Sequence, residues 1–179
     1  RPPAAPPAVR RAVLLGSGWL GPDAGSPLAA RGPAPPAWCA TRVAPSAAML
    51  AWLATERIRD GHFTSLGAAS GVVAGLVAIT PACAAVTPIG AIVVGAVAGV
   101  LCALAVGLKF KFGYDDSLDV VAVHLVGGLT GTLLIGFLAS EKAPNALNAL
   151  FSARGLPPPG HPATGAFSAL PSPRPAPPQ

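Results

Sequence analysis

His124 is the residue in this sequence whose type and surroundings most clearly offer chemistry. It lies within residues 120–139, an apolar stretch that contains no other ionisable side chain. A stretch this long and apolar predicts a membrane span, where an ionisable group is costly and points to a functional site. Because an imidazole exchanges protons near neutral pH, His124 indicates transport of a solute that can gain or lose a proton.

Two glycines favour open space beside that imidazole. Gly128 and Gly131 follow His124 by four and seven residues, so we expect all three to share one face of a helix. With no side chains on the glycines, this face can border either a pore lumen or a closely packed neighbouring helix. A histidine that hydrogen-bonds a neighbouring helix, with a purely structural role, explains these residues equally well.

Three acidic residues, Asp115, Asp116 and Asp119, open the helix that carries His124. Their oxygens could hold a cation, but their spacing does not match that of a calcium loop. Helix capping explains them better, with Asp116 at the N-cap and Asp119 in the first turn. Both carboxylates would then accept free backbone N–H groups and lie at the positive end of the helix dipole. We therefore predict no metal site.

The sequence contains no residue set typical of an enzyme or a cofactor site. No serine or cysteine has a histidine or aspartate partner at a recognisable spacing, and the glycines lack the strand–loop–lysine setting of a phosphate loop. Cys39, Cys83 and Cys102 lack metal-ligand spacing and suit small apolar positions in or near membrane helices. An enzyme built around His124 would lack a partner base. We therefore expect a protein that is not an enzyme and binds no cofactor.

The composition favours a membrane protein. Only 11% of the 179 residues are charged and 52% are hydrophobic, whereas soluble domains carry about 25% charged residues. The net charge of +5 comes from basic residues that are scattered or lie at the ends of apolar runs. Because no basic stripe with interleaved aromatic residues is present, we expect no nucleic-acid partner.

The helices that must position His124 follow from the distribution of charge and proline. Residues 61–108 contain no Lys, Arg, Asp or Glu, which leaves room for two spans of ~20 residues. Pro81 and Pro88 place a turn within this run, because neither suits a helix interior. The predicted fold is an all-α, polytopic transmembrane bundle over residues 13–142. Its spans are expected at residues 13–30, 38–55, 65–80, 89–108 and 117–139, and the Pro-rich ends, 1–12 and 143–179, are expected to be disordered.

Small residues recur every four positions along two of these spans. Such faces let membrane helices approach closely, which is how they associate without a hydrophobic driving force between them. A lipid-facing stripe of small residues is the alternative. The residues are Gly67, Gly71 and Gly75 in one span and Ala91, Gly95, Gly99, Ala103 and Gly107 in the next.

Basic residues also indicate how the spans are oriented. Arg57 and Arg59 lie in one connection, Lys109 and Lys111 lie in another, and the proline turn between them is uncharged. Because cytoplasmic loops carry an excess of Lys and Arg, we expect both basic connections inside the cell and the proline turn outside. The sequence therefore predicts a multi-pass protein of the cell membrane, surrounded by the lipid bilayer.

Several motifs resemble those of the ammonium transporter (Amt/Mep/Rh) family. The segments GAASGVVAGLVAITPA (residues 67–82) and GYDDSLDVVAVHLVGG (residues 113–128) are highly specific, and ERIRDG (residues 56–61) also fits. The segment GWLGPDAGSPLAARG (residues 18–32) is similar to the family's GWFGFNAGSALAANG. The resemblance covers residues 16–139 and implies an eleven-helix fold. This chain would hold the sixth to tenth helices, so we expect a fragment of a longer protein.

The resemblance also implies an activity and the residues that serve it. Family proteins form homotrimers with one pore per subunit, and they move ammonium or ammonia past two pore histidines. His124 matches one of these, and the other belongs to the fifth helix. Ser26 matches a serine of the external site that recruits ammonium, and Asp119 matches a motif acid that supports the pore helix.

The chain departs from the family near the external gate. Trp19 aligns with a motif tryptophan to which we assign no role, whereas Pro22 replaces a gating phenylalanine and Asp23 replaces an asparagine. A proline removes the aromatic plug and is expected to bend the helix. The alternative to transport is therefore a membrane fragment whose helices pack without forming a pore.

Overall fold

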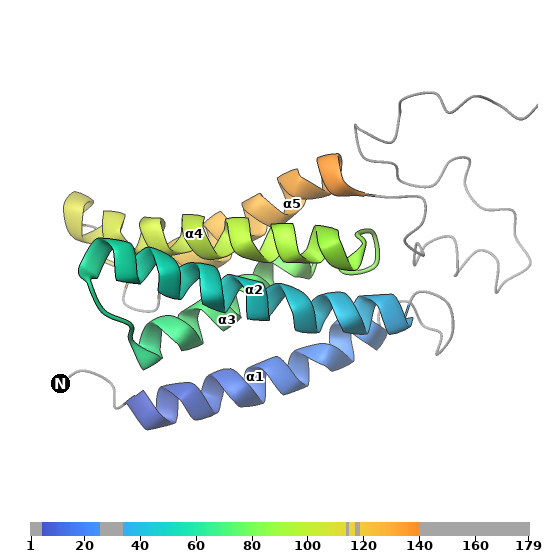
Figure 1. The fold of residues 1–179 in the computed structure, drawn as a ribbon, viewed down its shortest axis with the longest axis horizontal. Helices are drawn as coiled ribbons and strands as arrows, with labels where there is room; N and C mark the ends of the chain where they lie inside the picture. Colours follow the sequence, from blue (N-terminus) through green and yellow to red (C-terminus); the bar gives the residue numbers. More distant parts are fainter. Residues whose placement is uncertain (1–4, 26–33, 114, 117–118, 140–179) are drawn as a thin grey trace, which may run out of the picture.

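The computed structural model of this chain describes residues 5–25, 34–113, 115–116 and 119–139, which form an elongated helical bundle (Figure 1). Within these residues, β-type pairing is limited to one isolated bridge between Val86 and Ala139. The predicted all-α class is confirmed. The helices are α1 (Ala5–Gly25), α2 (Ala34–Asp60), α3 (Ser65–Ile79), α4 (Pro88–Phe112), the π-helical turn η1 (Val121–Leu125) and α5 (Val126–Leu138).

Helix α1 begins earlier than we expected. It starts at Ala5, inside the segment 1–12 for which disorder was expected. Pro6 and Pro7 lie in its first turn, where the backbone N–H groups have no intrahelical partner and a proline therefore breaks no hydrogen bond. The expected span at residues 13–30 is helical as far as Gly25. Its remainder, like the Pro-rich tail from residue 143, lies outside the described residues.

Threonine caps and the proline turn delimit α3 and α4, in agreement with the predicted boundaries. Thr64 and Thr87 each accept a hydrogen bond from the backbone N–H three residues later. Pro88 occupies the start of α4, where a proline is favoured. Helix α4 continues one turn further than predicted and ends before Gly113, whose φ of 67° lies in the left-handed region that glycine adopts readily.

Helix α2 packs against the glycine faces of both α3 and α4. A Cβ atom at Gly75 of α3 would lie 2.5 Å from the Pro45 Cα of α2. A Cβ atom at Gly95 of α4 would overlap the Ala44 carbonyl group of α2. Because these neighbours are backbone atoms, no side-chain movement could relieve the overlap. The small residues therefore mediate close helix packing, as predicted, rather than forming only a lipid-facing stripe.

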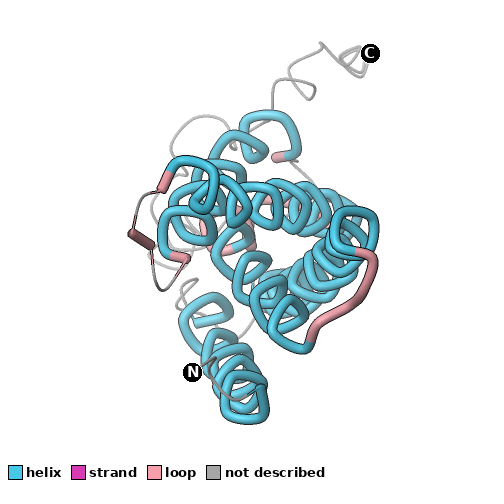
Figure 2. Tube along the Cα trace, turned by 90° about the vertical axis from the view of Figure 1, so that its left-hand side faces the viewer, coloured by secondary structure: helices cyan, strands magenta, loops and turns pink. Residues whose placement is uncertain are grey.

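Two described helical segments, Pro88–Lys109 and Val121–Leu138, are long and apolar enough to cross a membrane. Helix α3 is also apolar but has only 15 residues. Helix α1 lies at the edge of the bundle, against α2 and α3 (Figure 2). The outer sides of α4 and α5 expose large apolar side chains such as Ile92, Leu101 and Leu133, which suits a surface that meets lipid or further helices.

Candidate functional site

His124 lies in η1, the π-helical turn that precedes α5. Ala122 and Val123 fix the backbone of this turn, because they are buried at 0% and 4% exposure and Val123 packs into a core cluster with α3 and α4. The side chain of His124 is exposed, and so are those of its neighbours Val121 and Leu125. Turns of this type are frequent at functional sites. The turn presents an imidazole on an apolar surface from a well-packed backbone.

The glycines after His124 are arranged differently from the prediction. Gly131 is buried and packs against the Ala78 carbonyl group of α3, whereas His124 is exposed, so these two residues do not share a face. The π-helical turn shifts the register between His124 and Gly131. The prediction assumed α-helical spacing throughout and so did not include this shift. Among the described residues, the His124 side chain makes no hydrogen bond or ion pair. Its place in a pore stays a prediction.

Asp116 caps the helix that carries His124, as the sequence predicts. Its two carboxylate oxygens accept hydrogen bonds from the backbone N–H groups of Val120 at 2.8 Å and Val121 at 3.0 Å. A carboxylate in this position satisfies free N–H groups and favours the positive end of the helix dipole. Asp116 therefore helps to fix the start of the segment from which His124 projects.

Asp119 makes a different contact from the one expected. Its carboxylate pairs with Lys109 Nζ instead of accepting backbone N–H groups, and Lys109 Nζ also donates to the Asp116 carbonyl oxygen at 3.2 Å. Asp116 already occupies the N–H groups of the first turn, and Asp119 adopts a φ of 54°, in the left-handed region outside the helix. The ion pair joins the end of α4 to the start of the last helix. That Asp119 supports a pore helix stays a prediction.

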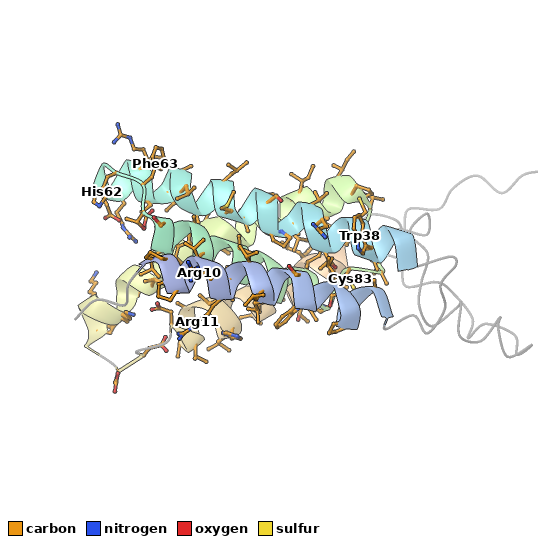
Figure 3. The ribbon with its side chains drawn as sticks, turned by 90° about the horizontal axis from the view of Figure 1, so that it is seen from below. Arg10, Arg11, Trp38, His62, Phe63 and Cys83 are labelled. Atoms are coloured by element: carbon orange, nitrogen blue, oxygen red, sulfur yellow. The ribbon has the colours of Figure 1, made fainter. Side chains whose placement is uncertain are left out.

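Other polar contacts gather at the same end of the bundle. Glu56 accepts hydrogen bonds from the N–H of Thr64 at 3.0 Å and from its hydroxyl group at 2.8 Å. Arg59 donates from Nη1 to the Ala103 carbonyl oxygen of α4 at 2.8 Å. His62 lies at this end of the molecule (Figure 3). We call residues 56–64 together with residues 103–119 the basic end.

The opposite end of the bundle is joined through hydroxyl groups. Trp19 of α1 donates from Nε1 to Thr80 Oγ1 at 2.8 Å, and Asp23 Oδ2 lies 2.8 Å from Thr41 Oγ1. Cys83 lies toward this end (Figure 3). We call Trp19, Asp23, Thr41 and Thr80 the hydroxyl end. Neither contact could be inferred from local sequence patterns, because the partners are 61 and 18 positions apart. Ser26, the candidate for the external site, follows α1 but lies outside the described residues.

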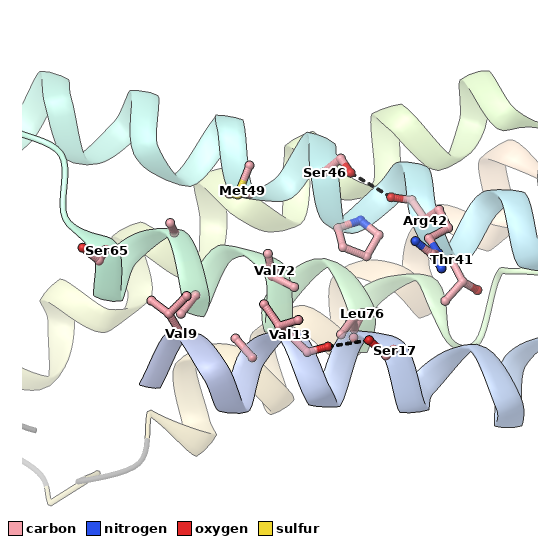
Figure 4. A pocket seen from close by; sticks show the side chains of 15 residues that line it. Val9, Val13, Ser17, Thr41, Arg42, Ser46, Met49, Ser65, Val72 and Leu76 are labelled. Carbon is pink, nitrogen blue, oxygen red and sulfur yellow. Dashed lines mark hydrogen bonds between the residues drawn. The ribbon is translucent and has the colours of Figure 1, made fainter. Parts of the chain in front are cut away.

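A cavity of about 340 Å³ lies between α1, α2 and α3 (Figure 4). Its walls are mostly apolar, with Val13, Val72 and Leu76 among them, while Ser17 and Arg42 contribute polar atoms. His124 does not line this cavity. The cavity is therefore separate from the candidate pore position, and we assign it no role in transport.

Comparison with known proteins places these observations in one family. The model of the Ammonium Transporter Family matches residues 5–158. An ammonium transporter of Mycobacterium tuberculosis is 65% identical over 133 residues, which cover 74% of this chain and 28% of that protein. An ammonium transporter of Aquifex aeolicus is 48% identical over 132 residues, which cover 73% of this chain and 31% of that protein.

The fold agrees with these relatives. The crystal structure of Saccharomyces cerevisiae Mep2 superposes with a TM-score of 0.71 and 36% identity, over 77% of this chain and 32% of that one. The chain thus spans less than a third of the length of the relatives named above. The matched part is a helical membrane bundle. By its motifs, its fold and the match over most of its length, the chain belongs to the ammonium transporter family.

Proposed function

We propose that this chain is part of a transporter that moves ammonium or ammonia across the cell membrane, and that His124 lines its hydrophobic pore. The observation that carries the proposal is the exposed imidazole on the apolar surface of η1 and α5, held by a buried backbone. Membership of the ammonium transporter family supports the choice of solute.

A histidine on an apolar surface suits this solute. Moving a bare cation into a dry pore is strongly unfavourable, whereas neutral ammonia loses little hydration free energy on entering. A pore lined by apolar groups and imidazoles therefore favours loss of a proton at the entrance, passage of ammonia, and relay of the proton by histidine. His124 would supply half of the relay, with a second histidine from another part of the intact transporter.

The remaining residues have supporting roles in this proposal. Ser26, after the end of α1, recruits ammonium at the external mouth. The Lys109–Asp119 pair holds the pore helix at the cytoplasmic side, where the basic end lies. The transporter functions in the lipid bilayer as a homotrimer with one pore per subunit, and it moves its substrate without chemical conversion, so it is not an enzyme.

Methylammonium uptake tests the proposal directly. The protein is expressed from its native gene in cells that lack their own ammonium transporters. His124→Ala is expected to reduce uptake to a small residual level, because the proton relay is interrupted. His62→Ala is the matched control, since it removes the other histidine found in the described residues, which is exposed at the basic end. This control is expected to retain uptake.

The possible results separate the proposal from its alternative. Equal uptake by the wild-type protein and His124→Ala would contradict a pore position for His124. No uptake by the wild-type protein would support a membrane fragment whose helices pack without a pore. His124→Glu is expected to differ from His124→Ala, because a carboxylate in the lumen can admit a cation. Wild-type-like uptake by both variants would also count against the pore position.

A further inference from the structure

The cavity between α1, α2 and α3 has a polar end and a largely apolar remainder (Figure 4). Arg42 lies at the polar end, beside Thr41 of the hydroxyl end, and Ser17 and Ser46 also line this part of the wall. Beyond them, apolar side chains form most of the wall as far as Val9. Among the described residues that line the cavity, Arg42 carries the only charge.

The cavity is open toward the surroundings of the bundle. Val13 of α1, which lines it, is 62% exposed, and the side chains of Arg42 and Ser46 are exposed as well. Its volume of about 340 Å³ lies in the range of sites that hold small organic molecules. In a bilayer, the molecules that meet such an open apolar wall are lipids. The cavity can therefore take up part of an acyl chain.

Arg42 lies at a depth where a positive charge needs a partner. Helix α2 has 27 residues and is therefore about 40 Å long, so it extends beyond a hydrocarbon layer of about 30 Å by about 5 Å at each end. Arg42 follows the first residue of α2 by eight positions, which places its backbone about 7 Å inside that layer. A charge at this depth is unfavourable unless the side chain reaches the headgroups or pairs with an anion.

Trp38 marks the direction in which the guanidinium extends. Side chains lean toward the N-terminus of their helix, so Arg42 extends toward Trp38, one turn closer to the membrane surface. Its Cζ lies over the Trp38 ring, 4.9 Å from the centroid. This contact uses the charge of the guanidinium and none of its five N–H donors. The ion pairs formed among the described residues belong to Arg59 and Lys109. Arg42 therefore has N–H donors to offer an anion at the level of the headgroups.

We propose that the cavity binds an anionic phospholipid, with one acyl chain between α1, α2 and α3 and the phosphate group on Arg42. Guanidinium groups bind phosphate through paired, charge-assisted hydrogen bonds. The single positive charge at the cavity favours a lipid with net negative charge over a zwitterionic one. The inference concerns the lipid contacts of the bundle and does not depend on the proposal about transport.

Quenching of Trp38 fluorescence by brominated lipids tests this proposal. The protein is placed in phosphatidylcholine vesicles that contain a small fraction of brominated lipid, either phosphatidylglycerol or phosphatidylcholine. Each protein is also measured with Trp38→Phe, and the quenching lost in that variant is assigned to Trp38. The wild-type protein is expected to show about fivefold stronger apparent binding of the anionic lipid, the preference that one arginine near a membrane surface provides.

Two arginine variants test the role of the charge. Arg42→Gln is expected to lose the preference, because the guanidinium is removed. Arg57→Gln is the matched control, since Arg57 is another exposed arginine of α2 and lies over the Phe63 ring at the basic end, 5.7 Å from the centroid. This control removes the same charge and is expected to keep the preference. Equal quenching of the wild-type protein by the two lipids, preference retained in Arg42→Gln, or preference lost in Arg57→Gln would each overturn the proposal.

Two glycine variants test the place of the acyl chain. A Cβ atom at Gly16, which lines the cavity, would lie 3.9 Å from Val72 and 4.0 Å from Leu76, at ordinary contact distances. Gly16→Leu is therefore expected to fold, to fill part of the cavity and to weaken quenching by the anionic lipid. Gly18→Leu adds the same side chain to α1 where no atom lies within 4 Å of the new Cβ, and it is expected to change nothing. If a protein segment filled the cavity instead of a lipid, Gly16→Leu would leave the quenching unchanged, which would overturn the proposal.

Discussion

The two ends of the bundle are held together by different chemistry. At the basic end the contacts use charged side chains, and the paired Lys109 and Asp119 keep side-chain exposures of 16% and 30%. At the hydroxyl end, Asp23 and Thr41 are almost fully buried, at 3% and 1% exposure. The basic end thus relies on contacts of charged side chains, whereas the hydroxyl end relies on hydrogen bonds to the hydroxyl groups of two threonines.

Each end also adjoins, along the sequence, one of the two candidate transport residues. The basic end fixes the start of the helix that carries His124, through Asp116 and the Lys109–Asp119 pair. The hydroxyl end fixes the last turns of α1, directly before Ser26. Changes at one end are therefore expected to affect one site more than the other, whereas changes in the middle of the bundle should affect both.

Gly95→Ala is expected to have the largest effect, because it acts between the two ends. The added Cβ would overlap the backbone of Ala44 in α2, and such overpacking is expected to cost about 3 kcal/mol of folding free energy. Chemical unfolding measures the loss. Gly136→Ala makes the same chemical change where no atom lies within 4 Å of the new Cβ, and it should be nearly neutral. Equal losses in the two variants would show that the close contact at Gly95 does not limit packing.

Glu56→Ala is expected to weaken the basic end alone. It leaves the N–H and hydroxyl groups of Thr64 without their acceptor at a site where Glu56 is 9% exposed, which should cost about 2 kcal/mol. Glu56→Gln keeps one acceptor oxygen and should cost less. The free energy of unfolding of both variants checks this order, and a larger loss in the glutamine variant would contradict it.

Thr41→Val is expected to weaken the hydroxyl end by about 1 kcal/mol, because the hydrogen bond between Thr41 and Asp23 is lost. If the two ends are independent, the loss should add to that of Glu56→Ala in the double variant. A double-mutant cycle measures this. A coupling free energy comparable to the smaller single effect would show that the ends are not separate units.

Cys83 offers the mildest test, since it probes burial at the hydroxyl end without changing the chain. Burial raises the pKa of its thiol to about 11, so the reactive thiolate is scarce at neutral pH. Labelling with a water-soluble maleimide is expected to be slow at neutral pH and faster at alkaline pH. The less buried Cys39 serves as the internal reference in mass spectrometry. Rapid labelling of Cys83 at neutral pH would mean that this end opens.

The sequence was sufficient to predict the features that depend on local composition. The uncharged run and its two prolines placed α3 and α4. The four-residue spacing of glycine predicted the faces that meet α2. Asp116 was identified as a cap, because a carboxylate shortly before an apolar helix has a strong local preference for free N–H groups. All three inferences rest on neighbours within a few residues.

Features that depend on tertiary contacts could not be predicted in this way. The π-helical turn at His124 removed Gly131 from its predicted face. The Asp119 carboxylate pairs with Lys109, because the Asp116 carboxylate already accepts the free backbone N–H groups of the first turn. The partner of Trp19 lies 61 residues away, and no local pattern indicates it. Register shifts and distant side-chain pairs are decided by packing, which local spacing does not encode.

A pore position for His124 requires that the side chain at position 124 lies in the path of the transported solute. Replacing His124 with cysteine, in a protein whose native cysteines are changed to serine, allows a small thiol reagent to be attached there. Methylammonium uptake is then measured in lipid vesicles before and after modification of each sample. This comparison separates the effect of the attached reagent from the effect of losing the histidine. Modification at position 124 is expected to block the residual uptake, whereas modification of the matched His62→Cys protein is expected to leave its uptake unchanged. Complete labelling at position 124 with uptake unchanged would contradict it.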